Sequence, residues 1–526
     1  MKNKTNTEVL ISSIRSDNSG RGKKLEEVLP HLDKPWYRYK SLVTLNFFLL
    51  ACIVTQLTIG YDGGMMNNLQ TLSSWQGFFN YPVGARLGTM NNSIAIGALA
   101  VNLLISPMAE YMGRKWPIII GSVFCIVGAV LQGAAPSFGC FVGGRVLIGV
   151  GTTISGALAE VYLTESAYPT HRPIIVGLLQ AGYPLGSLIG TLVTWGPYNA
   201  SGLKNSTWSW RIPSLLQGFF PLLQLLIFLF SWESPRYLIS KGKVEVARAF
   251  FVKYHGNGDA ESELVNFQMA EITASIDAEK KRNRVGWKTW ISTKPMIHRL
   301  CIVCGLAPMI QLCGNAIISY YLSIMLNEIH ITDGITKLKI NLGISAWGLI
   351  CDICACFAMR FFGRKTMFMF GFASMCVCYV IYTIIAARIS IVDFKSNSLA
   401  AGAIAMIFLF QGFYHCVSPV AITYYTEISP FALRGKASQI YSLTGTAIGF
   451  FNGYVNPIAL VKISWKYYIV YDIWLVCMFL IVFLFFPETK GKSLEEMNEA
   501  FGDPIIDDNA VEEYEKNYLS KVATED

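Results

Sequence analysis

Two ionisable side chains in otherwise apolar stretches are the residues of this sequence best suited to chemistry. Asp62 follows an apolar run and precedes two glycines, and Arg145 lies inside another apolar run. A charged side chain within a membrane is costly, so such a group is usually paired and functional. We expect Asp62 and Arg145 to pair. A purely structural ion pair at the end of the first helix is the alternative.

Two further ionisable residues, Asp352 and His415, interrupt apolar runs in the second part of the chain. A proton relay or a substrate contact would suit both, since histidine changes charge near neutral pH. For His415 the simpler interpretation is a neutral, hydrogen-bonded ring. Asp352 leaves both interpretations open, because no cation lies near it in sequence.

A third group of charged residues occurs twice. The segments AEVYLTESAYPTHR (159–172) and AITYYTEISPFALR (421–434) share the pattern A-x-x-Y-x-T-E followed by an arginine seven residues later. GRK occurs at 113–115 and at 363–365, and ESPR (233–236) has a counterpart in PETK (487–490). Three landmarks repeated in one order indicate a duplicated architecture. In a hydrophobic chain, duplicated halves are typical of alternating-access transporters.

The elements that must position these residues are membrane helices. Hydrophobic residues make up 53% of the 526 residues and charged residues 15%, whereas soluble domains carry about 25% charged residues. A helix needs about 20 apolar residues to cross a bilayer. Twelve such runs occur, at 42–62, 89–109, 116–135, 139–163, 174–196, 212–231, 300–326, 338–361, 366–387, 399–426, 437–460 and 467–487.

The sequence therefore predicts an all-α membrane protein with twelve transmembrane helices in two pseudo-symmetric six-helix bundles. The expected parts are a cytoplasmic N-terminal tail (1–41), an N-terminal bundle (42–232), a cytoplasmic helical loop (233–299), a C-terminal bundle (300–487) and a cytoplasmic C-terminal tail (488–526). Lys and Arg concentrate in alternate connections, which places both termini in the cytoplasm. Glycosylation at the sequons of Asn199 and Asn205 is left open.

Charge and cysteine content exclude several classes. The net charge of +8 mostly reflects this cytoplasmic bias and does not indicate nucleic-acid binding. The thirteen cysteines lie almost entirely in apolar runs, where thiols behave as small hydrophobes. We expect no metal site, no cofactor and no enzymatic activity.

The motifs together resemble the sugar-porter family of the major facilitator superfamily over nearly the whole chain. They are GYD (60–62), GRK (113–115), GRVLIGVG (144–151), the two Glu-x6-Arg copies, ESPRYL (233–238), QLCGN…SYY (311–321) and PETKG (487–491). QLCGNAIISYYL and KYHGNGD are similar to the yeast lactose-permease and cellodextrin-transporter branch. The resemblance implies a monomeric carrier in a fungal plasma membrane that imports a sugar with a proton.

The resemblance also assigns roles to residues. In proton-coupled members the aspartate matching Asp62 takes the proton, and the arginine matching Arg145 adjusts its affinity. Facilitative hexose carriers also have this aspartate, so facilitation remains an alternative. Tyr320 and Tyr321 are expected at the outer gate.

Family positions for sugar contacts differ from the usual hexose set. Gln180 and Gln311 match family glutamines, but Trp347 replaces an asparagine and Tyr414 a glutamate. The expected substrate-binding residues are Gln180, Gln311, Asn315, Trp347, Phe413 and Tyr414. Because several hexose-binding amides are absent, a disaccharide or glycoside is favoured over a single hexose. A carrier of a non-sugar and a porter-like nutrient sensor are further alternatives, and the short C-terminal tail argues against a sensor.

The repeated charged motifs imply a cytoplasmic gate, in which weak ion pairs of about 1 kcal/mol each can break during transport. The expected gate residues are Glu110, Arg114, Glu165, Arg172, Glu233, Arg236, Arg364, Glu427 and Arg434. Glu110 precedes the first GRK, and the second copy is expected to have Met359 in its place. We therefore expect a weaker second-half cluster.

Overall fold

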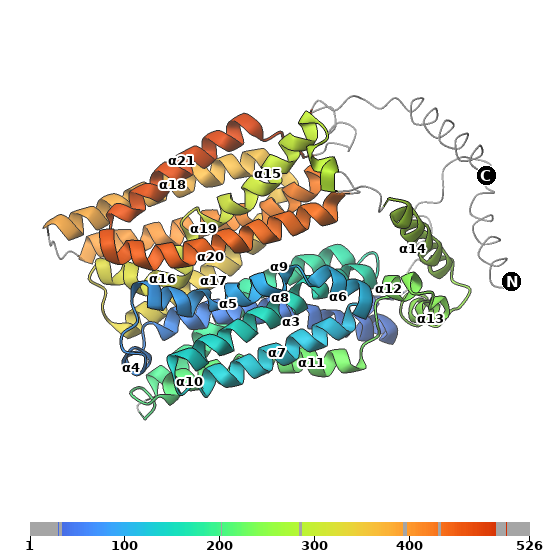
Figure 1. Cartoon of the computed structure of the whole chain (residues 1–526), viewed down its shortest axis with the longest axis horizontal. Helices are drawn as coiled ribbons and strands as arrows, with labels where there is room; N and C mark the ends of the chain where they lie inside the picture. The colour runs from blue at the N-terminus through green and yellow to red at the C-terminus, as the bar shows by residue number, and fades with distance from the viewer. Residues whose placement is uncertain are drawn as a thin grey trace.

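The computed structural model describes residues 30, 34–200, 202–282, 287–392, 397–429, 433–490 and 501. The described residues form helices in two bundles that lie side by side (Figure 1). The first half contains α3 (Lys40–Leu69), α5 (Gly84–Asn102), α6 (Ile105–Met112), α7 (Lys115–Gly133), α8 (Phe138–Ser166), α9 (Arg172–Asn199), α10 (Trp208–Leu216) and α11 (Phe219–Phe230). The second half contains α15 (Lys294–Gln311), α16 (Asn315–Glu328), α17 (Gly334–Phe361), α18 (Arg364–Val392), α19 (Asn397–Ile428), α20 (Arg434–Ile463) and α21 (Lys466–Phe485).

All twelve predicted spans have helical counterparts. Among the described residues, nine helical segments are long and apolar enough to cross a membrane, and the pair α5–α6, bent by 54°, makes a tenth. The remaining two spans correspond to α9 (28 residues) and α20 (30 residues), which are long enough. The predicted fold class of two six-helix bundles is confirmed.

Short helices connect and cover the bundles. η1 (Trp36–Arg38) precedes α3, and α4 (Ser73–Phe78) follows it. The central loop forms α12 (Pro235–Ser240), α13 (Val244–Tyr254), α14 (Glu263–Arg282) and η2 (Trp287–Ile291). Figure 1 places α12–α14 at one end of the molecule and α4 at the other. We call these the charged end, which also carries both GRK motifs, and the opposite end.

The first half is held together by helices whose backbones nearly touch. A methyl group added at Gly64 of α3 would lie 2.3 Å from the carbonyl oxygen of Ser187 in α9, and one at Gly186 would lie 2.2 Å from that of Leu57. Small residues four apart allow such close approach between membrane helices. This packing brings α9 directly against the part of α3 that carries Asp62.

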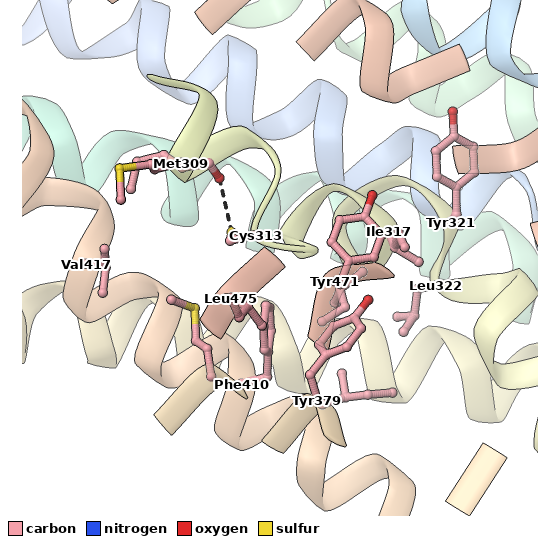
Figure 2. Packing of buried hydrophobic residues seen from close by; sticks show 14 of the residues in the cluster. Met309, Cys313, Ile317, Tyr321, Leu322, Tyr379, Phe410, Val417, Tyr471 and Leu475 are labelled. Carbon is pink, nitrogen blue, oxygen red and sulfur yellow. Dashed lines mark hydrogen bonds between the residues drawn. The ribbon is translucent and has the colours of Figure 1, made fainter. Parts of the chain in front are cut away.

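The second half is held together mainly by side chains. Figure 2 shows part of its core, where Tyr379, Phe410, Tyr471 and Leu475 pack around the break between α15 and α16. The break depends on Gly314, whose φ of +101° favours glycine, and a methyl group there would lie 2.9 Å from the ring of Tyr379. The predicted single span 300–326 is therefore two helices.

Candidate functional site

Asp62 and Arg145 form a buried ion pair in the first half. The guanidinium donates from Nη1 to Asp62 Oδ1 (3.0 Å) and from Nη2 to Oδ2 (3.1 Å), while its Nε donates to the carbonyl of Met90 (2.7 Å). Asp62 is 4% exposed and Arg145 0%. The expectation that Asp62 ends its helix was wrong, because α3 continues to Leu69. The carboxylate therefore lies within the bundle.

Sequence reasoning missed a third member of this group, Gln217. Its Nε2 donates to Asp62 Oδ1 over 2.9 Å, and the residue lies at the break between α10 and α11. A glutamine in the middle of an apolar run was the available signal. The carboxylate thus accepts bonds from both a cation and a neutral amide.

A cavity of about 410 Å³ lies against this pair, between the two halves. Asp62, Asn91 and Arg145 line it from the first half, and Gln311 and Tyr441 from the second. Both side-chain polar atoms of Asn91 are buried without a hydrogen-bond partner. The cavity therefore brings the amide side chains of Asn91 and Gln311 close to the Asp62 carboxylate.

A larger cavity of about 590 Å³ shares Gln311, Ala316 and Tyr320 with the first. Its polar lining comes from both halves, and its aromatic groups include Tyr183 and Tyr414. Amides and hydroxyls both donate and accept hydrogen bonds, as sugar hydroxyls do. The volume falls within the range of small-molecule sites, roughly 300–1,000 Å³.

The break in the seventh span positions two of the predicted contacts. Gln311 is the last residue of α15 and Asn315 the first of α16, and both line the larger cavity. Broken helices at the midplane commonly build transporter sites, because they expose polar groups there. Tyr414 of α19 also lines this cavity.

Two predicted substrate contacts, Trp347 and Phe413, lie away from both cavities in this structure. Trp347 is 37% exposed and donates from Nε1 to the carbonyl of Phe408 (3.0 Å), and Phe413 packs edge-on against Phe370 with ring centroids 5.7 Å apart. Neither lines either of the two cavities. Both were assigned by motif position, which gives the helix but not the face. The side chain of Gln180 lies outside the described residues.

The two tyrosines predicted at the outer gate have different places. Tyr320 lines both cavities. Tyr321 is fully buried, with non-helical backbone angles inside α16, and its hydroxyl donates to the carbonyl of Gly453 (2.7 Å). Tyr320 therefore faces the cavities, whereas Tyr321 fixes α16 against α20.

A group of amides joins the halves towards the opposite end. Asn67 Nδ2 lies 3.2 Å from Asn341 Oδ1, and Asn341 Nδ2 donates to Asn68 Oδ1 over 2.6 Å. Gln70 Nε2 donates to the carbonyl of Tyr320 (2.7 Å). Asn67 and Asn341 also line the larger cavity. Sequence reasoning missed them because the first helix was expected to end before Asn67.

Asp352 and His415 meet on the second-half wall of the larger cavity. His415 Nδ1 lies 2.8 Å from Asp352 Oδ1. Both residues line the cavity. This partner of Asp352 could not be predicted from the sequence, because α17 and α19 become neighbours only when the chain folds.

At the charged end of the first half, Arg114 lies at the centre of a cluster of acids. Its Nη2 donates to Glu165 Oε1 (2.9 Å), and its backbone N–H donates to Glu233 Oε1 (2.9 Å). Arg236 Nε lies 4.0 Å from Glu165 Oε1. Burial raises the pKa of Glu233, while the backbone N–H donors oppose that shift.

The second half repeats the main contacts of this cluster, although Arg364 Nε also donates to Glu427 Oε1 whereas Arg114 Nε has no hydrogen-bond partner among the described residues. Arg364 Nη2 donates to Glu427 Oε1 (2.8 Å), and its backbone N–H donates to Glu488 Oε1 (2.8 Å). Thr489 Oγ1 donates to Glu427 Oε2 as Ser234 Oγ does to Glu165 Oε2. The two clusters therefore share their central arginine–glutamate contacts, while within the described part of the chain only Glu165 has a second cation, Arg236, within 4.0 Å.

The expectation of a weaker second cluster was wrong. Met359 corresponds to Ala109, because the carbonyl of each accepts a bond from the arginine five residues later. Glu110 is exposed and forms no ion pair among the described residues. The acids that bind the arginines come instead from Glu165 and Glu233 and their second-half counterparts.

Two more predicted gate residues lie at the starts of helices. Arg172 begins α9 with an exposed side chain, and it forms no ion pair within the part of the chain that the structure describes. The side chain of Arg434, which begins α20, lies outside the described residues. Every ion pair found at this end joins residues of the same half.

A family model described as "Sugar (and other) transporter" matches residues 48–501. The chain belongs to this family. It is accordingly a multi-pass membrane transporter of the major facilitator superfamily and not an enzyme. The chain is 27% identical to a "High-affinity glucose transporter" of Kluyveromyces lactis, over 87% of this chain and 84% of that protein. It is 26% identical to "High-affinity glucose transporter 1" of Candida albicans, over 94% and 91%.

Solved structures of the same fold include the xylose transporter XylE from E. coli in an inward-open conformation. The TM-score is 0.71 at 21% sequence identity, over 87% of this transporter and 99% of that chain. A second XylE structure, described as a proton:xylose symporter with a bound sugar analogue, gives a TM-score of 0.69 at 21% identity. These likenesses establish the shared architecture.

Proposed function

We propose that this transporter imports a sugar together with a proton by alternating access. The observation that carries the proposal is the Asp62–Arg145 pair, a bidentate ion pair at the wall of a cavity between the halves. Proton coupling needs a carboxylate that can exist in both states during the cycle. A carboxylate held by one cation meets this need, because moving the cation away favours the protonated form.

The sequence of events follows from the contacts of Arg145. Its guanidinium also donates to the carbonyl of Met90 in α5, so a shift of α5 against α8 changes its position. When Arg145 withdraws, Asp62 takes a proton, and Gln217 still supplies a hydrogen-bond partner. Re-forming the ion pair after the cavity opens to the other side releases the proton.

Alternating access is supported by the unequal contacts at the two ends. Towards the opposite end, Asn67 and Gln70 of α3 hydrogen-bond to the second half. At the charged end the described ion pairs stay within each half, and the hydrogen bonds from Gln439 Nε2 to Ser106 Oγ and from Asn102 Nδ2 to Ser442 Oγ join exposed side chains of the two halves. The contacts between the halves are thus mostly buried at the opposite end and exposed at the charged end, which we assign to the cytoplasm from the Lys and Arg content of its loops. Both termini then lie inside the cell, and we propose the plasma membrane as its location.

A disaccharide or glycoside is the proposed substrate. Two cavities that share Gln311 and Tyr320 give room for two sugar rings, and neither Trp347 nor Phe413 lines them. The similarity to yeast glucose transporters favours a single hexose as the second candidate. Facilitated diffusion of that hexose is the corresponding alternative mechanism.

The experiment uses yeast that lacks its own sugar carriers and expresses the full chain. Cells receive glucose, lactose or cellobiose while a pH electrode follows the unbuffered medium. Alkalinisation that accompanies uptake of one sugar is the expected result. Uptake without proton influx would remove the coupling, and uptake of glucose alone would remove the disaccharide proposal.

A further inference from the structure

The larger cavity contains a carboxylate–imidazole pair that the proposed mechanism does not use. Asp352 of α17 and His415 of α19 lie 2.8 Å apart through Oδ1 and Nδ1. The other ring nitrogen, Nε2, lies 3.2 Å from Nε2 of Gln411. No described residue forms a hydrogen bond with Asp352 Oδ2, so this oxygen remains available to the cavity that Asp352 lines.

Gln411 provides a second, independent observation, because one of its hydrogen-bond acceptors is unsatisfied. It is 6% exposed, lines the larger cavity, and its Oε1 is buried without a hydrogen-bond partner. With a neutral ring, Nδ1–H donates to Asp352 and Nε2 accepts from the Gln411 amide. When a proton binds Nε2, a half-turn of the amide presents Oε1 as the acceptor. The site can therefore satisfy the ring in both charge states.

The imidazole has little freedom to leave this position. It packs against Gly348 of α17, where an added methyl group would lie 2.7 Å from Nε2. On the other side of α19, Val417 and Phe413 face Gly371 and Phe370 of α18, which carry no charge. The ring is thus fixed between a carboxylate and an amide.

The other titratable groups of the described residues near the pair are hydroxyls and thiols. They are Tyr183 from α9, Tyr320 from α16, Cys351 and Cys354 on α17, and Tyr414 and Cys416 on α19. α3 contributes uncharged residues such as Gln56 and Asn67. None of the described residues that line this cavity is Lys or Arg.

We propose that Asp352, His415 and Gln411 form a second proton-binding site, which makes sugar affinity in the larger cavity depend on pH. With the ring neutral, the pair carries a net charge of −1 next to the cavity. With the ring protonated, the pair is an ion pair of zero net charge. A sugar that displaces water from this wall leaves less uncompensated charge in the second case, because burying an unpaired charge is costly.

Acid pH therefore strengthens sugar binding, and sugar in turn favours protonation of His415, since linkage is reciprocal. Asp62 lies against the smaller cavity, and Tyr183 is electrostatically close to both Asp62 and Asp352, so the affinity test below is made without the Asp62 charge. The inference rests on the proposed function only in taking the larger cavity as the sugar site.

The first test needs no sugar and uses the purified full chain. Diethyl pyrocarbonate modifies neutral but not protonated imidazole, and mass spectrometry reports each histidine separately. At pH 6, Asp352→Asn is expected to raise the modification rate of His415 about fivefold or more relative to exposed His330, because a neighbouring carboxylate stabilises imidazolium. Asp472→Asn, a change in α21 outside both cavities, is the control and leaves the rate unchanged. An equal rate in wild type and Asp352→Asn would overturn the proton site.

The second test measures sugar counterflow in proteoliposomes without a pH gradient, in the Asp62→Asn background. The probe is whichever of glucose, lactose and cellobiose gives uptake in cells. Apparent affinity is expected to fall about fivefold to tenfold from pH 5.5 to pH 7.5, a coupling of about 1 kcal/mol. Adding His415→Gln abolishes this dependence.

A pH dependence that survives His415→Gln would overturn the link to affinity. The proposed function can fail separately, by a lack of proton influx in cells, while both of these tests succeed.

Discussion

The two halves share one architecture but use it differently. At the charged end they share the same central contacts, with Arg114, Glu165 and Glu233 matched by Arg364, Glu427 and Glu488. Within the bundles they differ, because the first half packs backbone against backbone through glycines and the second through aromatic side chains.

The ionisable groups follow the same division. The first half holds a fully buried pair with three hydrogen bonds to the carboxylate, whereas Asp352 and His415 are partly exposed to the larger cavity. Tight packing suits a group that changes partner only when whole helices move. Where helices pack through side chains, a residue that lines the cavity can be substituted while the helices stay in place. Such a wall suits substrate recognition.

The largest difference in stability between the halves should appear when one arginine is replaced in each half. Arg145→Met leaves Asp62 buried with only Gln217, and loss of one partner of a buried pair costs about 3–5 kcal/mol. Arg364→Met removes a cation that pairs with the partly exposed Glu427, where the cost is about 1 kcal/mol. Thermal unfolding followed by size-exclusion chromatography measures both variants.

Asp62→Asn/Arg145→Met serves as the control, because it removes both charges. It should recover most of the lost stability. Equal loss in the two single variants would contradict the difference in burial.

Glycine substitutions probe the two packing modes. Gly60→Ala places a methyl 1.9 Å from the backbone carbonyl of Tyr183, so α3 and α9 must separate, at a cost of about 2–3 kcal/mol. Gly371→Ala places one 2.0 Å from Cγ2 of Val417, which can rotate, and the expected cost is about 1 kcal/mol. Gly305→Ala, with no atom within 4 Å, is the neutral control. A larger loss at Gly371 than at Gly60 would reverse the comparison.

The charged ends should respond alike in stability, since the central bond from arginine Nη2 to glutamate Oε1 is the same in both. Glu165→Gln and Glu427→Gln each remove a charge-assisted bond to an arginine while keeping the shape, for about 1–2 kcal/mol each. Thermal midpoints of the two variants should agree closely. A lower thermal midpoint in Glu165→Gln but not in Glu427→Gln would instead support a weaker second cluster.

The smallest expected effect concerns α13, which covers the charged end of the first half. His255 of α13 is buried, with Nδ1 2.7 Å from Gln268 Oε1 and Nε2 3.3 Å from the Ser166 carbonyl. Burial lowers its pKa to about 4. The unfolded segment, with its ordinary histidine pKa, therefore binds the proton more tightly. Docking stability is complete above about pH 6.5 and is lost as pH falls towards 4, by about 1 kcal/mol at pH 5.5.

Hydrogen exchange of the α13 amides, corrected for intrinsic rates, measures this loss. His255→Gln removes the titrating ring and should make the protection of α13 independent of pH between 5.5 and 7.5. Equal pH dependence in wild type and variant would assign the effect to another group.

Sequence predicted the fold well because bilayer thickness dictates long apolar runs, and all twelve spans correspond to observed helices. It missed the breaks at Gly314 and Gln217, since average hydropathy does not register a backbone turn. It also ended the first helix too early, since the polar residues up to Leu69 are buried against the second half instead of facing water.

The site was predicted in part, for a related reason. Asp62 and Arg145 are rare charges in apolar runs. Their pairing could be predicted because an unpaired charge within a membrane is energetically costly. Trp347 and Phe413 were assigned by motif position, which does not fix the rotation about the helix axis, and neither lines the two cavities. The contact of Asp352 with His415 depends on α17 packing against α19, which no sequence spacing encodes.

The most direct test of the central claim is the steady-state ratio of internal to external sugar in yeast that expresses the transporter. The sugar is the one that gives uptake with alkalinisation. Wild type and the Asp472→Asn control should accumulate it above a ratio of one and lose this accumulation on adding a protonophore. Asp62→Asn should reach a ratio of one while still exchanging sugar. Accumulation by Asp62→Asn equal to wild type, or a wild-type ratio of one, would contradict the account.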